Sequence, residues 1–128
     1  MVVEEASTPL AERWWRGQGG RASFVGGFAA AEVAATISRG LRARRFTAPQ
    51  AADALADFDA LRALCEVFAP TPRIFDRAEA LVRDFSLKLA APDALHLAGA
   101  IEAGLALVTF DRRLADAARL VGVEAVFP

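Results

Sequence analysis

Helical and strand-like patterns of apolar positions alternate along the chain. Segments with apolar residues every three or four positions predict amphipathic helices, and short apolar runs between them predict buried strands. The predicted helices cover 4–16, 28–41, 47–64, 71–85, 92–103 and 112–120, and the predicted strands cover 22–25, 65–68, 105–110 and 123–127. Strands that alternate with helices favour an α/β fold with a parallel sheet.

Local signals fix several of the predicted helix ends. Thr47 can cap the helix that follows it, with Pro49 in its first turn, and Gly104 should end the helix over 92–103. In the helix after Thr47 the large apolar residues are expected to form one buried stripe. These residues are Leu55, Phe58 and Leu61 or Leu64.

Length and composition indicate one globular domain over residues 1–128. The chain is 55% hydrophobic and carries a net charge of −1, so neither disorder nor a general basic field is expected. No apolar run is long enough for a membrane span, and the acidic pair Glu4-Glu5 is the wrong charge for a signal peptide. A single cysteine, Cys65, excludes an internal disulfide framework and a cysteine-based zinc site. We therefore expect a cytoplasmic protein without a membrane partner.

Two aspartates stand where an α/β fold concentrates its chemistry. Asp93 lies in the first turn of one predicted helix, and Asp111 lies between a predicted strand and the next helix. In open parallel sheets such positions converge on one crevice, where two carboxylates repel each other unless a divalent cation lies between them. Each residue also has an ordinary interpretation, since helix starts favour acids and Asp is a preferred N-cap.

Two further acids are candidates for the same site. Glu32 interrupts a run of small apolar residues that is expected to be buried, where carboxylates are rarely left unpaired. It could face a shared cation or form a salt bridge with Arg39. Asp116 follows Asp111 by five residues and could add a more distant carboxylate, or could lie exposed on the helix.

The only histidine and the main basic run each allow two interpretations. His96 shares a helix face with Asp93 and could act as a ligand or base, or could be a half-buried, hydrogen-bonded imidazole. The arginines at the end of the helix over 28–41 could contact phosphates, or could stand there because cations are favoured at helix C-termini. They are Arg39, Arg42, Arg44 and Arg45. Asp53 and Asp57 are expected to belong to a solvated face.

Three segments together resemble the PIN-domain family, specifically the toxin ribonucleases of bacterial type II toxin–antitoxin pairs (the VapC type). The segments are Phe28-Ala-Ala-Ala-Glu32-Val-Ala-Ala with Arg39, Ala91-Pro-Asp93-Ala-Leu-His-Leu-Ala98, and Leu107-Val-Thr-Phe-Asp111-Arg-Arg-Leu114. Each motif is weak alone, but their order and spacing make the resemblance fairly specific, and they span most of the chain.

The resemblance implies a three-layer α/β/α fold with a central parallel sheet and a metal-dependent endoribonuclease. Glu32, Asp93 and Asp111, with Asp116, would hold Mg²⁺ or Mn²⁺ and hydrolyse RNA phosphodiester bonds. The implied partners are an RNA substrate, a cognate antitoxin and a second copy of the chain in a homodimer.

One part of the family pattern has no counterpart here. Family members begin with a central strand that ends in an Asp, whereas Met1-Val-Val-Glu-Glu-Ala-Ser resembles the helix after it. We therefore expect a single PIN-like domain that lacks its first strand and one carboxylate, which the nucleotide sequence upstream of the Met1 codon would test. The rival hypothesis is a catalytically impaired binding module that holds an antitoxin peptide or another protomer through apolar helices such as 47–64.

Overall fold

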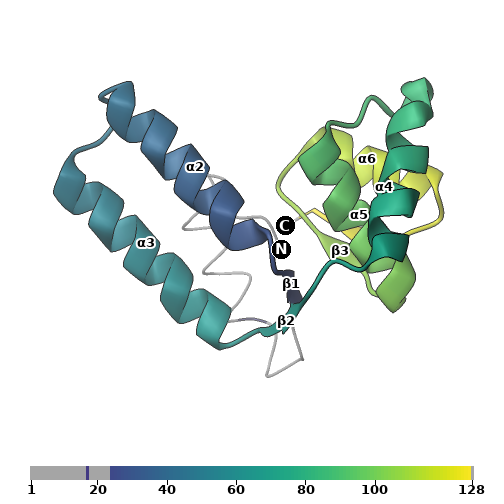
Figure 1. The fold of residues 1–128 in the computed structure, drawn as a ribbon, viewed down its shortest axis with the longest axis horizontal. Helices are drawn as coiled ribbons and strands as arrows, with labels where there is room; N and C mark the ends of the chain where they lie inside the picture. The colour runs from purple at the N-terminus through teal and green to yellow at the C-terminus, as the bar shows by residue number, and fades with distance from the viewer. Residues whose placement is uncertain (1–16, 18–23, 128) are drawn as a thin grey trace. The chain divides into compact units, whose positions relative to one another are not determined.

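The computed structural model describes Gly17 and residues 24–127 (Figure 1). The predicted helix over 4–16 and the start of the predicted strand over 22–25 lie outside these residues. The chain divides into two compact units, Arg21–Ala69 and Pro70–Pro128 together with Met1–Gly20. We describe each unit by itself, and the single domain over 1–128 stays a prediction.

The first unit is a helical hairpin closed by a pair of parallel strands. Helices α2 (Ala29–Arg42) and α3 (Ala48–Ala63) lie side by side (Figure 1). Strand β1 (Phe24–Gly26) enters α2, and β2 (Glu66–Phe68) leaves α3. The strands pair in parallel over their whole length, from Phe24 opposite Glu66 to Gly26 opposite Phe68.

The start of α3 confirms the predicted cap. The Thr47 hydroxyl accepts from the Gln50 backbone N–H at 3.4 Å, and the Gln50 side chain accepts from the Thr47 N–H at 2.8 Å. The predicted stripe of α3 is confirmed in part: Phe58 and Leu61 are half-buried, whereas Leu55 and Leu64 are exposed, and only Ala51 is fully buried in this helix. Two helices and two short strands enclose too little volume to bury several large side chains.

The turn between α2 and α3 has a tightly defined backbone. The N–H of Arg45 donates to the Gly40 carbonyl at 2.9 Å and that of Arg44 to the Leu41 carbonyl at 3.1 Å. These two bonds form a Schellman motif, with Arg44 in the left-handed region at φ 55°. The ring of Phe46 lies so close to the α-carbon of Gly40 that a side chain there would overlap with it.

The second unit packs three helices around a parallel strand pair. Its elements are α4 (Pro72–Arg83), the 3-10 turn η2 (Phe85–Leu87), α5 (Ala91–Ala103), β3 (Leu107–Val108), α6 (Arg112–Leu120) and β4 (Ala125–Val126). Residues of α5 and α6, among them Leu97 and Leu114, form the core and are at most 1% exposed. Strands β3 and β4 pair with Leu107 opposite Ala125 and Val108 opposite Val126.

Ion pairs join α4 to α5 at the edge of this core. The carboxylate of Glu102 on α5 is 17% exposed and pairs with both Arg73, at 2.8 Å, and Arg77 of α4. The predicted stop at Gly104 is confirmed, because this residue caps α5 with φ 65°.

Helix positions agree with the prediction better than strand lengths do. The helices over 28–41, 47–64, 92–103 and 112–120 are confirmed to within one residue, while that over 71–85 gives way to η2 after Arg83. The predicted strands over 105–110 and 123–127 shrink to two residues each. Within residues 24–127 the strands form two separate parallel pairs, so the α/β class is confirmed and the single central sheet is not seen. None of the described helices has the length and apolarity needed to cross a bilayer.

The close approach of Phe46 to Gly40 predicts that Gly40→Ala will destabilise the hairpin. The added methyl group must displace the ring, and overpacking of this kind costs about 1–3 kcal/mol. Urea unfolding followed by circular dichroism measures the loss. The double variant Gly40→Ala/Phe46→Ala is the control, since it removes the overlap. If the loss of unfolding free energy in the double variant equals the sum of the losses in the two single variants, the close contact is contradicted.

Candidate active site

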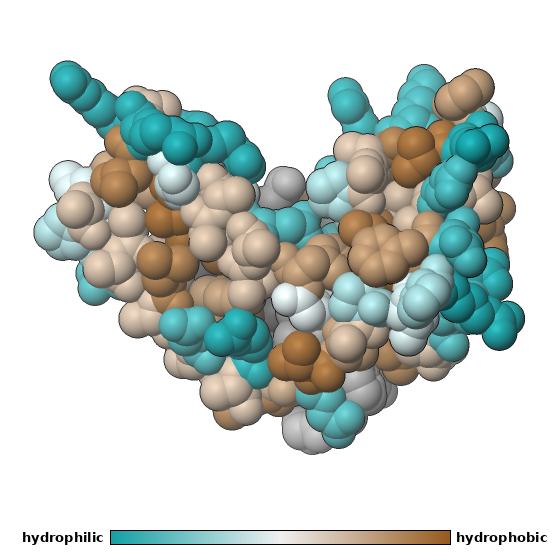
Figure 2. Space-filling model, viewed as in Figure 1, coloured by the Kyte–Doolittle hydropathy of each residue, from teal (hydrophilic) through white to brown (hydrophobic). Residues whose placement is uncertain are grey.

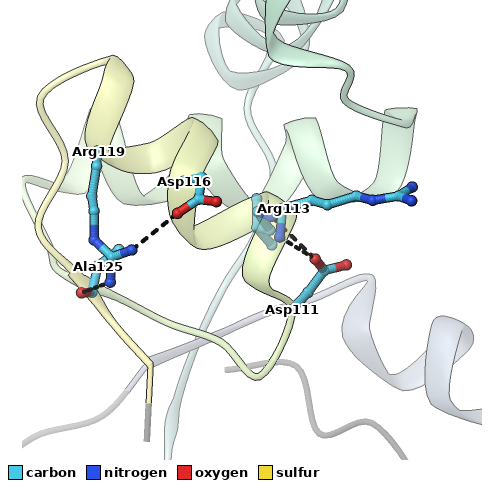
Figure 3. Close-up of polar contacts among 6 residues, drawn as sticks. Asp111, Arg113, Asp116, Arg119 and Ala125 are labelled. Atoms are coloured by element: carbon cyan, nitrogen blue, oxygen red, sulfur yellow. Dashed lines mark hydrogen bonds and ion pairs between the residues drawn. The ribbon is translucent and has the colours of Figure 1, made fainter.

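Asp111 is the candidate residue whose position the structure defines best. Its Oδ1 accepts from the backbone N–H groups of Arg113, at 2.8 Å, and Leu114, at 3.2 Å, and so caps α6 (Figure 3). Its own N–H donates to the hydroxyl of Thr109 at 3.0 Å, and Thr109 is 1% exposed. The helix start therefore holds the carboxylate, and the buried threonine holds the backbone of the same residue.

The cap leaves one oxygen of the Asp111 carboxylate, Oδ2, for another ligand. Both capping bonds use Oδ1, and no donor within the described residues bonds to Oδ2. The side chain is half-buried. The N-cap interpretation is thus confirmed, and it is compatible with cation binding, because a carboxylate can accept at both oxygens.

Asp93 also lies near a helix start, on the neighbouring helix α5. It lies in the first turn of α5, directly after Pro92, and is half-buried. The helix dipole favours a negative charge at this position. The same unit therefore carries Asp93 and Asp111 at the N-terminal ends of two helices, α5 and α6, that pack against each other.

Asp116 lies on an exposed part of α6. Its side chain is 63% exposed and pairs with Arg119 at 3.2 Å, and Arg119 also donates to the Ala125 carbonyl at 3.2 Å (Figure 3). These contacts tie α6 to β4. Its role as a more distant metal ligand stays a prediction, and the arginine already neutralises much of its charge.

Glu32 belongs to the first unit and does not form the alternative salt bridge. It lies in the first turn of α2 and is half-buried. Arg39 instead donates to the Thr36 hydroxyl at 3.0 Å, and no ion pair joins it to Glu32. In the part of the chain that is described, no three His, Cys, Asp or Glu side chains gather into a group that could hold a metal ion. The proposed trio spans both units and stays a prediction.

Two arginines follow Asp111 in the first turn of α6, where the helix dipole disfavours cations. The Arg112 guanidinium lies over the ring of Phe127, with 5.2 Å from its central carbon to the ring centroid. Arg113 extends from α6 away from Asp116 (Figure 3). Among residues 24–127 neither arginine forms an ion pair, so positive charge stands unneutralised beside Asp111. Sequence reasoning missed Phe127, which carries no motif and reaches Arg112 only through the fold.

The histidine and the cysteine are unsuited to acid–base or nucleophilic chemistry. His96 is 6% exposed, more buried than predicted, and burial lowers its pKa to about 4. Its imidazole is therefore neutral near pH 7. Cys65 donates to the Leu61 carbonyl at 3.4 Å, and burial raises the pKa of its thiol. A thiol held protonated is a poor nucleophile.

The buried His96 predicts a loss of stability in mild acid. The imidazole takes up a proton below about pH 6.5 in the unfolded chain but only near pH 4 in the folded one, so stability falls as the pH drops through this window and levels off below it. The full shift corresponds to about 3 kcal/mol. Urea unfolding of the parent chain and of His96→Gln, at several pH values from 7 to 4, measures it. Identical pH dependence in both proteins would contradict the prediction.

Comparison with known proteins identifies the family of the chain. Residues 3–120 match the family described as PIN domain. A search of curated proteins gave no match. The matched segment contains Glu32, Asp93, Asp111 and Asp116. PIN domains are generally nucleases that use divalent metal ions, and they often occur in toxin–antitoxin systems. Because the match covers most of its length, the chain belongs to the PIN domain family.

Proposed function

We propose that this chain is a metal-dependent endoribonuclease and the toxin component of a toxin–antitoxin pair in the cytoplasm. The observation that carries the proposal is the Asp111 carboxylate, which is fixed through Oδ1 and has no described donor at Oδ2. Such a group is oriented before any ligand binds, which lowers the cost of ordering a site. Family membership supplies the reaction class.

The side chains assigned to the site fit a hard divalent cation. Glu32, Asp93 and Asp111 offer only carboxylate oxygens, the ligands that Mg²⁺ and Mn²⁺ prefer. Asp116 would lie further out, because its carboxylate pairs with Arg119. A bound cation would lower the pKa of a water molecule and stabilise the charge that develops on the phosphate.

The residues around Asp111 would act on the substrate and on the ligand geometry. Thr109 and the amides at the start of α6 keep the carboxylate in one orientation. Arg112, held over Phe127, and Arg113 would bind phosphate groups of the RNA on either side of the cleaved bond. Arginine suits this role, because its guanidinium can make two hydrogen bonds to one phosphate.

The complete architecture is part of the proposal. We infer a three-layer α/β/α fold with one central parallel sheet. The short strand pairs of the described residues support this, since pairs of two or three residues add little stability alone.

A second candidate is a binding module without catalysis. The exposure of large apolar residues on and after α3 favours it, with Leu64 68% and Val67 57% exposed. Figure 2 shows hydrophobic residues reaching the surface of the α2–α3 hairpin. Such residues could contact an antitoxin or a second protomer in a homodimer, whether or not the chain cleaves RNA.

The Asp111→Asn variant tests the proposed function. Asparagine still caps α6, so the thermal midpoint should change little. Cleavage of RNA with Mg²⁺ or Mn²⁺ should fall at least about a hundredfold, because a ligand carboxylate is lost. Asp57→Asn, at an exposed position of α3, is the matched control and should retain full activity.

Two results would contradict the nuclease. One is RNA cleavage by Asp111→Asn at the parent rate. The other is a parent chain that cleaves no RNA and releases no heat when titrated with Mn²⁺, which would favour the binding module. Cleavage that persists in EDTA would contradict metal dependence.

A further inference from the structure

The turn between α2 and α3 carries an exposed group of positive charges. We call Arg42, Arg44 and Arg45 the arginine tip; all three are exposed. The sequence has no Asp or Glu between Glu32 and Asp53. Figure 2 shows hydrophilic residues covering the outer side of α2 up to this turn.

The backbone under the arginine tip is fixed on both sides. The Schellman motif ends α2, the Phe46 ring packs against Gly40, and the Thr47–Gln50 capping box starts α3. The arginines therefore project from a turn of defined conformation. A rigid turn also reduces the entropy lost when its side chains bind a ligand.

Arg44 occupies a position that normally takes glycine. Its φ of 55° is left-handed, and at this place in a Schellman motif an L-residue with a Cβ is strained by about 1 kcal/mol. Within the described part of the chain, the guanidinium groups of Arg42 and Arg44 form no ion pair or hydrogen bond. The strain at Arg44 is thus not offset by a contact of its side chain in the hairpin.

A helix C-terminus explains only part of this charge. The dipole favours cations in the last turn, which accounts for Arg39 and Arg42. Arg44 and Arg45 follow the last helical residue, and Arg44 is strained there. The arrangement fits a ligand with repeated negative charges, because each arginine can bind a separate phosphate.

We propose that the arginine tip binds the phosphate backbone of RNA, as a contact separate from the carboxylate site. The choice of RNA rests on the proposed function. The contact is independent of base sequence, because guanidinium–phosphate bonds carry no base information. It raises the affinity for RNA without taking part in cleavage.

RNA binding in EDTA tests the arginine tip apart from catalysis. The probe is a fluorescein-labelled single-stranded RNA of about 20 nucleotides, and anisotropy gives its Kd at several KCl concentrations. In the double variant Arg42→Gln/Arg44→Gln, the slope of log K against log salt should shrink by about 1.4, or about 0.7 for each lost phosphate contact.

The matched control removes the same charge from arginines that are already paired. Arg62 pairs with Asp59 at 3.5 Å and Arg83 with Glu79 at 2.7 Å. The variant Arg62→Gln/Arg83→Gln should leave the salt slope near that of the parent chain. If both double variants lose RNA affinity equally, the loss follows from net charge alone, and the proposal is overturned.

The single variant Arg44→Gly separates binding from folding. Glycine relieves the left-handed strain, so the thermal midpoint should rise while the Kd for RNA increases several-fold. A variant that binds RNA as the parent does would overturn the proposal.

The outcomes for the two proposals can be told apart. If the parent binds RNA through the arginine tip but never cleaves it with Mg²⁺ or Mn²⁺, the proposed nuclease activity is contradicted and RNA binding by the arginine tip is supported. If the parent cleaves RNA but the arginine-tip variants bind RNA as tightly as the parent, RNA binding by the arginine tip is contradicted and the nuclease activity is supported.

Discussion

The start of α6 holds the Asp111 carboxylate in one orientation. Two backbone amides at the start of α6 bind one of its oxygens, and the buried hydroxyl of Thr109 fixes the peptide before it. These contacts orient a negative charge at a helix N-terminus, where the dipole stabilises it. The same structural element thus starts a helix and leaves one carboxylate oxygen outside the cap.

Local interactions explain why some features could be predicted from the sequence. The caps at Thr47, Gly104 and Asp111 depend on residues within a few positions of each other, so their sequence signals are direct. Four helices, α2, α3, α5 and α6, fall within one residue of their predicted bounds. The candidate acids Asp93 and Asp111 were found in the same way, from their places at helix starts.

Features that depend on distant parts of the chain were predicted less well. Strand length depends on pairing partners, and the runs over 105–110 and 123–127 pair over only two residues. The large residues of α3 required a core that the hairpin is too small to provide. The contact of Arg112 with Phe127 and the left-handed backbone of Arg44 have no local signature, because they arise from packing and from a particular turn.

The most direct test of the central claim is paramagnetic broadening by Mn²⁺ in the amide spectrum of the labelled chain. If Glu32, Asp93 and Asp111 share one cation, substoichiometric Mn²⁺ should broaden the signals of all three segments together, and Mg²⁺ should restore them by competition. Broadening that spares Glu32, or that spreads evenly over exposed acids such as Asp57 and Asp116, would contradict a common site.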